Sequence, residues 1–425
     1  MTHGALERPV GAFLGRRWSA SVVSQSEDAS VTETRFMAAI VAAQVLVQIG
    51  AFTLPALLPH YIAAWSLSAT EAGWLIGAFF AAYVAAVPVL VGLTDRLPAR
   101  RIYLVGAGAT ALSHLGFALL ADGFWGGLLM RAIGGIGWAG CYMPGLKAIA
   151  DRLEGTAQSR AVSWHAIGVG IAGAGSFAVA GLLDAIAGPS AAFLFAAAAA
   201  TAAFAIGLAV LPNVAVASRA TGSPLDFRPV FRNRAAMAWI AGYTVHTWEM
   251  AALRAWGVTF LAAVIALHGA PAWLPGPSAI FTAAGLLGIA VSVTGNEMAQ
   301  RFGRARVVAA AMATAALLSL LAGWSVLVSA PLAALCVLAW NAAIYLDSAS
   351  LTAGTVQAAE KERRGATMGL HSMCGYAGGF VGPIGVGLAL DLAGHGGLGW
   401  GLAFGHLAAV TLAGFWLLRR LARRG

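Results

Sequence analysis

Four charged side chains stand out inside apolar stretches that are otherwise long enough to cross a membrane. Arg131, Glu249, Arg254 and Asp347 all lie inside such stretches. A charge in the bilayer core costs roughly 2.5–3.5 kcal/mol on insertion scales, so each of these residues is a candidate functional residue. The two arginines could bind a carboxylate or a phosphate, because the planar guanidinium donates two parallel hydrogen bonds. Glu249 and Asp347 could each take up and release a proton.

Each charge also has a structural interpretation. Glu249 and Arg254 could form an ion pair, but a five-residue spacing separates them by about 140° around a regular helix, so direct pairing would require a kink. Arg131 could serve helix packing alone and reach the outer membrane interface. These alternatives remain open on the sequence.

Neutral polar side chains accompany the charges. Gln44 and Gln48 are four residues apart and therefore share a helix face. Asn341, Tyr345 and Ser348 also share a face through their spacing. Three further candidates near the charged residues are Tyr243, His246 and Trp340.

The composition indicates that these residues lie on helices inside a membrane. The 425 residues are 60% hydrophobic and 10% charged, whereas a soluble protein is nearer 25% charged. Stretches of about 20 apolar residues recur, which is the length that crosses a ~30 Å hydrocarbon core as a helix. We therefore expect an all-α polytopic membrane protein. The predicted spans are 36–60, 73–94, 102–121, 125–150, 162–184, 190–212, 235–265, 277–298, 306–326, 331–355, 368–390 and 398–418.

The basic residues give an orientation. If the N-terminus lies inside, the loops predicted outside contain no Lys or Arg, and those predicted inside contain most of them. This pattern supports twelve spans in a bacterial-type inner membrane with both termini cytoplasmic. The net charge of +9 then reflects topology, and no nucleic-acid partner is expected.

The chain divides into two similar halves. A cytoplasmic tail over 1–34 precedes six spans in 35–212, and a linker over 213–234 leads to six more in 235–425. The loop after span two contains Asp95, Arg96, Arg100 and Arg101. A loop about half the chain later contains Arg301 and Arg304. Such repeats are expected when two six-helix bundles enclose a central path.

Over nearly its whole length the sequence resembles the major facilitator superfamily. Asp95, Arg96, Arg100 and Arg101 match the signature loop of that family, although Pro98 stands where the family usually has Gly. Arg131, followed by spaced small residues, is similar to the pattern of the fourth helix. The resemblance implies two pseudo-symmetric bundles that alternate between two open states. Loop charges then act as gates, the gating residues here being Asp95, Arg96, Arg100, Arg101, Arg301 and Arg304.

The resemblance also implies that spans one, four, seven and ten line a central cavity. The expected substrate-binding residues are Gln44, Gln48, Arg131, Tyr243, His246, Arg254, Trp340, Asn341 and Tyr345. Glu249 and Asp347 are the expected proton-coupling residues.

The function predicted from these residues is transport of a small organic anion coupled to protons. Efflux of amphipathic or cationic compounds is the alternative within the same fold, and a non-transporting membrane sensor is an alternative of another class. No phosphate-binding loop or catalytic motif is visible, so we expect neither an enzyme nor a cofactor or metal. The expected partners are a small-molecule substrate, protons and membrane lipid, with the protein a monomer.

Overall fold

The computed structural model describes residues 33–94, 96–213 and 227–422, and every regular element in these ranges is a helix. The first span covers Glu33–Ala64 and ends in α2 (Thr53–Ala64). The other elements of the first half are α3 (Ala69–Leu93), α4 (Ala99–Leu119), α5 (Phe124–Ala150), α6 (Gly155–Ala187) and α7 (Pro189–Val210). The second half contains α8 (Arg228–Arg232), α9 (Arg234–His268), α10 (Pro277–Phe302), α11 (Arg304–Ser325), α12 (Ala330–Ala358), a 3-10 turn (Lys361–Arg363), α13 (Arg364–Ala393) and α14 (Gly397–Ala422).

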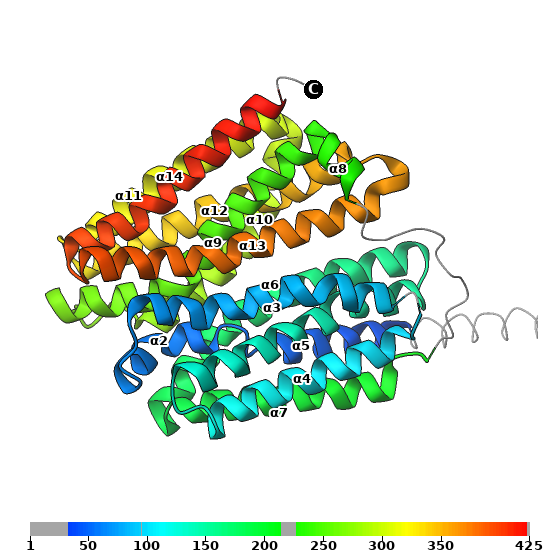
Figure 1. Ribbon diagram of the computed structural model, residues 1–425, viewed down its shortest axis with the longest axis horizontal. Coiled ribbons are helices and arrows are strands. Elements are labelled where there is room, and N and C mark those ends of the chain that lie inside the picture. The colour runs from blue at the N-terminus through cyan, green and yellow to red at the C-terminus, as the bar shows by residue number, and fades with distance from the viewer. Residues whose placement is uncertain (1–32, 95, 214–226, 423–425) are drawn as a thin grey trace, which may run out of the picture.

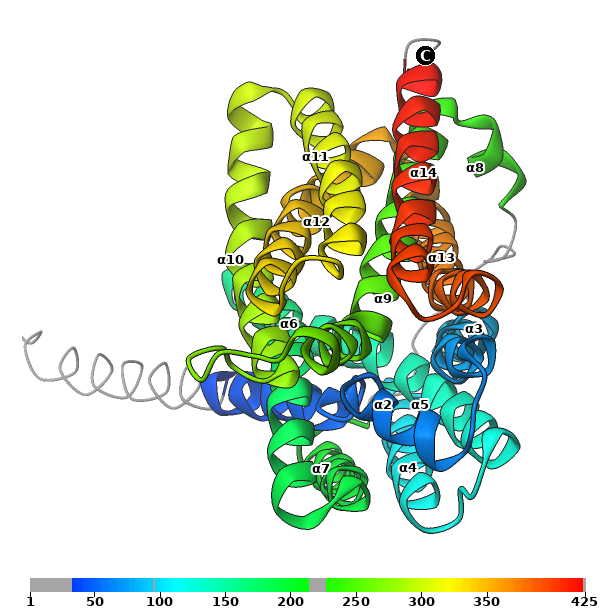
Figure 2. The same ribbon diagram turned by 90° about the vertical axis from the view of Figure 1, so that its left-hand side faces the viewer.

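The predicted all-α polytopic fold is confirmed. In the described ranges, eleven helices are long and apolar enough to cross a membrane. The remaining predicted span, the fourth, is the 27-residue helix α5, which contains the buried Arg131. The first span and α3–α7 form one bundle, and α9–α14 form the other, side by side (Figures 1 and 2). The short α8 lies within the predicted linker, of which residues 214–226 are outside the described ranges.

The first span is broken in its middle, where the sequence predicts a continuous helix. Residues 33–48 are helical, 49–52 form a turn, and α2 follows. The backbone N–H of Phe52 donates to the Ser176 hydroxyl at 2.9 Å. At Gly50 an added Cβ would collide with the side chains of His114 and Ala196, so glycine is required at this close approach. The break turns the Phe52 ring toward the second bundle.

The hydrophobic core shows where the two bundles meet. We call the end that contains the α3–α4, α5–α6 and α10–α11 connections the basic end, since the arginines gather there. Away from the basic end, one buried cluster joins both bundles, from Phe52 and Phe177 to Phe260 and Phe404. Toward the basic end, the buried clusters are separate and each stays within one bundle. The bundles are therefore closed on each other at the opposite end.

A carboxylate joins the bundles at that opposite end. Asp391, near the C-terminus of α13, accepts hydrogen bonds from the backbone N–H groups of Ala69 and Thr70 at 2.9 and 2.8 Å. Ala69 begins α3, and the N-terminus of a helix favours a negative charge. Asp391 thus stabilises the arrangement in which the opposite end is closed.

We predict that Asp391→Ala shifts the conformational equilibrium toward opening of that end. The two hydrogen bonds and the helix-end charge contribute about 1.5 kcal/mol, which corresponds to a shift of about tenfold in population. Spin labels at Ser190→Cys and Ala270→Cys, in a chain without its native cysteines, would report the distance distribution. Asp122→Asn, an exposed carboxylate at the same end, is the control. An unchanged distribution in Asp391→Ala would contradict the prediction.

Candidate functional site

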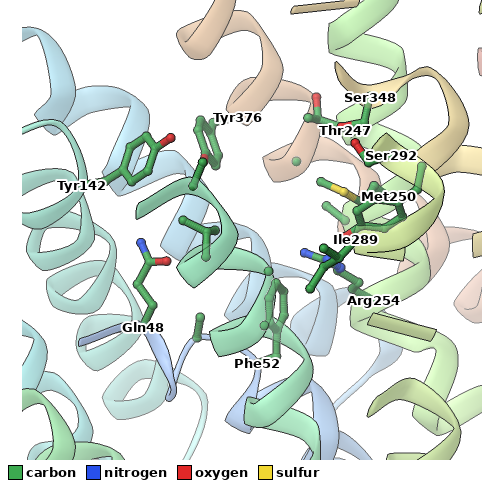
Figure 3. A pocket seen from close by; sticks show the side chains of 18 of the residues that line it. Gln48, Phe52, Tyr142, Thr247, Met250, Arg254, Ile289, Ser292, Ser348 and Tyr376 are labelled. Atoms are coloured by element: carbon green, nitrogen blue, oxygen red, sulfur yellow. The ribbon is translucent and has the colours of Figure 1, made fainter. Parts of the chain in front are cut away.

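A cavity of about 380 Å³ lies between the two bundles. It is lined by the first span, α3, α5 and α6 on one side and by α9, α10, α12 and α13 on the other. All four spans expected to line a central path contribute to it. The wall is strongly aromatic, and its rings are those of Phe52, Phe80, Trp138, Tyr142, Tyr243, Tyr345 and Tyr376. Figure 3 shows Gln48 and Tyr142 facing Arg254, Met250 and Ser292 across the space.

Arg254 is the only charged side chain among the described residues that line the cavity. Its guanidinium lies 4.7 Å from the Phe52 ring centroid and 5.4 Å from that of Tyr345. Within the described ranges it has no hydrogen bond and no ion pair. Two aromatic faces from different bundles therefore hold a cation whose hydrogen-bond donors remain available to a ligand.

The structure brings four of the nine expected substrate-binding residues to the cavity, namely Gln48, Tyr243, Arg254 and Tyr345. The other five lie behind its wall. Asn341 donates to the Ala284 carbonyl at 2.7 Å and so joins α12 to α10. Trp340 is fully buried inside the second bundle. Gln44, Arg131 and His246 are also buried and are not cavity-lining.

Glu249 points away from the cavity into the second bundle. Its carboxylate accepts hydrogen bonds from the Trp340 indole at 2.6 Å and from the Thr411 hydroxyl at 2.8 Å. Arg254 points into the cavity from the same helix, so the two residues do not pair. This placement follows the angular separation expected from their spacing. A role in holding α9, α12 and α14 together accounts for both contacts of Glu249.

Asp347 belongs to a polar group that does reach the cavity. Its carboxylate bonds to His246 Nδ1 at 2.8 Å, and both side chains are almost completely buried. His246 stacks on Tyr243 at 5.8 Å between centroids, and Tyr243 stacks on His371 at 3.8 Å. Since Tyr243 lines the cavity, the chain of side chains connects a buried carboxylate to the central space.

Arg131 packs inside the first bundle. Its Nε donates to the Leu75 carbonyl at 3.3 Å, and its guanidinium lies 4.6 Å from the Phe79 ring centroid. Both partners belong to α3, so the geometry favours a packing role over contact with a substrate in the cavity.

We predict that Arg131→Ala lowers stability without changing ligand affinity. Removal of a large buried side chain leaves a void that costs about 2–4 kcal/mol of unfolding free energy. Thermal unfolding in detergent would measure the loss, and Arg131→Met, which fills the space, is expected to recover most of it. If Arg131→Ala and Arg131→Met both lose ligand affinity while stability is unchanged, Arg131 contacts the ligand and the packing role is wrong.

The gating candidates make contacts within their own bundles. Arg100 donates to the Leu208 carbonyl at 2.6 Å, and Arg304 donates to the Gln357 side chain. Arg301 lies over the Phe302 ring, and Arg96 and Arg101 are exposed. Asp95 lies outside the described residues. A gating role for these residues remains a prediction. The hydrophobic cores of the two bundles are separate at the basic end, so the bundles are not packed together where these residues lie.

Most of the aromatic wall was missed by sequence reasoning. Phe52, Trp138, Tyr142 and Tyr376 line the cavity, but in an apolar chain they look like any other membrane-facing ring. Trp125 and Trp138 belong to the same helix, and only the second is buried. The sequence could have predicted Ser348 as a lining residue, because it shares a helix face with the candidate Tyr345. Both residues line the cavity.

Comparison with known proteins agrees with this architecture. A model of the Major Facilitator Superfamily matches residues 40–383. The structure of the nucleoside transporter NupG is 14% identical, with a TM-score of 0.72, and the alignment covers 92% of this chain and 98% of that one. A bacterial homologue of the human lysosomal transporter Spinster, inward-facing and occupied, is 16% identical with a TM-score of 0.70, over 92% and 95% of the two chains.

The human organic anion transporter MFSD10 is 20% identical, with a TM-score of 0.65, over 91% of this chain and 99% of that chain. The comparison with curated proteins gives no match. At these identities the solved structures show only a shared fold. The family model matches most of the chain and therefore shows the family. The protein therefore belongs to the major facilitator superfamily and is a multi-pass membrane transporter.

Proposed function

We propose that the protein transports a small organic anion by alternating access. The observation that carries the proposal is Arg254, a cation without a hydrogen-bond or ion-pair partner in the described ranges, in a cavity with no other charged lining residue there. A guanidinium in this position favours a carboxylate, sulfonate or phosphate. The volume of about 380 Å³ suits a small ligand.

Proton coupling is part of the proposal. Asp347 is the stronger of the two candidate carriers, because the His246 and Tyr243 side chains link it to the cavity. Glu249 has both carboxylate oxygens occupied inside the bundle. A buried carboxylate that can bind a proton next to a substrate site is a common arrangement for coupling in membrane transporters.

Alternating access is supported by the unequal contacts at the two ends. A core shared between the bundles and the Asp391 contact close one end, while the cores at the basic end are separate. Rocking of the two bundles about the cavity would open the end that is now closed and close the basic end. We place the basic end and both termini on the cytoplasmic side of an inner membrane, with the monomer as the working unit.

Efflux of cationic compounds fits the cavity less well. The described lining residues include no carboxylate, and Arg254 would repel a cation. Among the structural neighbours, the human protein is described as an organic anion transporter, which agrees with the anion proposal without establishing it.

Thermal unfolding in the presence of matched ligands of opposite charge tests the proposal. Phenylacetate and benzenesulfonate are the anions, and phenethylammonium is the cation of similar size. A ligand that binds the folded state raises the unfolding temperature. We expect stabilisation by the anions and none by the cation. Stabilisation by phenethylammonium alone would overturn the anion proposal and favour efflux of cations.

A further inference from the structure

We propose that the transported anion carries a neutral hydrogen-bonding group at the end opposite its charge, and that Gln48, with Gln44 and His165 behind the cavity wall, provides the subsite for this group. The inference rests on the proposed anion transport. It assigns to the first bundle a binding role that complements Arg254 in the second bundle.

Gln48 provides the first observation. Its side chain is only 3% exposed and lines the cavity, yet neither its amide nitrogen nor its amide oxygen has a hydrogen-bond partner. In Figure 3 it extends beside Tyr142, on the side of the cavity that faces Arg254. Buried polar side-chain atoms nearly always have partners, so an unpartnered amide that lines a cavity is suited to a ligand.

Gln44 and His165 are also unpartnered but lie behind the cavity wall. Gln44 lies one helical turn before Gln48 on the same face, is fully buried, and has no partner for either amide atom. His165 of α6 is also fully buried, with both ring nitrogens unpartnered. It packs against Tyr142, with ring centroids 5.5 Å apart, and Tyr142 lines the cavity.

The two buried side chains lie on neighbouring positions of the contact between the first span and α6. A Cβ at Gly168 would lie 3.7 Å from Cγ of Gln44, and His165 occupies the same face of α6 as Gly168 because the two are three residues apart. Six side-chain atoms without partners thus belong to three side chains of the first span and α6, and Nε2 of His165 faces α5, where a Cβ at Gly145 would lie 3.0 Å from it. Each unmade bond costs about 1–3 kcal/mol, so the cluster is poorly explained as packing.

The chemistry of the cluster defines what it would bind. An amide presents both a donor and an acceptor, and a neutral imidazole does the same. The subsite therefore matches a hydroxyl, carbonyl or amide group. The wall of the cavity that also holds Arg254 is aromatic and includes Phe52, Trp138 and Tyr345, which suits a flat apolar body. A substrate of this kind would contact both bundles at once.

Binding of three related anions tests the subsite. The probes are phenylacetate and its 3-hydroxy and 4-hydroxy derivatives, with affinities measured by calorimetry on the purified protein. In the unsubstituted protein we expect at least one hydroxy derivative to bind about tenfold more tightly than phenylacetate, as one good hydrogen bond would provide. In Gln48→Leu this preference should disappear while the affinity for phenylacetate itself is kept.

A second measurement separates a binding role from a structural one. Because leucine removes two unpartnered polar atoms from a buried position, Gln48→Leu should raise the unfolding temperature of the ligand-free protein. His165→Leu should behave in the same way. Gln357→Leu is the matched control, since Gln357 is exposed at the basic end and bonds to Arg304; it should leave the preference unchanged.

Equal affinities for all three anions in the unsubstituted protein would overturn the subsite, and so would a preference that persists in both Gln48→Leu and His165→Leu. The unpartnered atoms would then be satisfied by water alone. If none of the three anions binds, the anion proposal itself fails, and this inference fails with it.

Discussion

Arg254→Ala is expected to weaken binding of phenylacetate and benzenesulfonate by about 100-fold while the protein remains folded. Two hydrogen bonds from a charged donor contribute about 3 kcal/mol, which corresponds to this factor in affinity. The guanidinium has no protein hydrogen bond to lose within the described ranges and lies over the Phe52 and Tyr345 rings. The loss should therefore appear in ligand affinity, measured by calorimetry, far more than in unfolding temperature.

Two further variants make the result specific. Arg254→Lys keeps the charge but loses the planar fork, so it should recover only part of the affinity. Arg131→Ala removes the other membrane arginine, which bonds to α3 outside the cavity, and should leave affinity unchanged. Equal losses of affinity in Arg131→Ala and Arg254→Ala would indicate a general effect of positive charge and not a contact with the ligand.

The fold could be predicted from the sequence because membrane spans are set by local properties. Span length, apolar composition and the alternation of basic loops each depend on neighbouring residues only. The break at residues 49–52 could not be predicted in this way. It is stabilised by the Ser176 hydroxyl, which is 124 residues away in the chain, and by the close approach of Gly50 to His114.

The position of Arg131 shows why the site was harder to predict than the fold. On a regular helix, Arg131 and Trp138 lie on nearly the same face, and Trp138 does line the cavity. Seven residues of helix place Arg131 about 10 Å further along the axis. At that level the helices of the first bundle close on each other, and Arg131 meets Leu75 and Phe79. The sequence indicates the face of a helix but not the height at which a cavity begins or ends.

Glu249 shows a related limit. A carboxylate in a membrane helix is a functional candidate because burying its charge costs free energy. From the sequence, this criterion is the same for a carboxylate that faces a cavity and for one that faces a neighbouring helix. Only the partners distinguish the two cases. Trp340 and Thr411, from α12 and α14, satisfy both oxygens of Glu249, and neither partner is close to it in sequence.

We predict that Asp347→Asn abolishes proton-driven accumulation of the anion while exchange of anion for anion continues. Asparagine preserves the size of the side chain and one acceptor oxygen for His246, but it cannot bind and release a proton. His246 on α9 bonds to Asp347 directly, and Tyr243 and His371 continue the contact toward the cavity. Glu249, also on α9, interacts with Asp347 electrostatically. Loss of the carboxylate should remove the coupling step and leave the anion site and its Arg254 intact.

The measurement uses benzenesulfonate, an anion that stays ionised and does not cross protein-free membranes. It is added outside empty liposomes to measure accumulation and placed on both sides to measure exchange. With one proton carried per anion, a gradient of one pH unit should support about tenfold accumulation by the unsubstituted protein. Asp347→Asn should give no accumulation and near-normal exchange at equal pH. Glu249→Gln should still accumulate the anion, because the structure gives Glu249 a packing role and no path to the cavity. The reverse result, with coupling lost in Glu249→Gln and kept in Asp347→Asn, would mean that Glu249 is the group that binds the proton. The contacts from Asp347 through His246 and Tyr243 would then serve only to pack the helices.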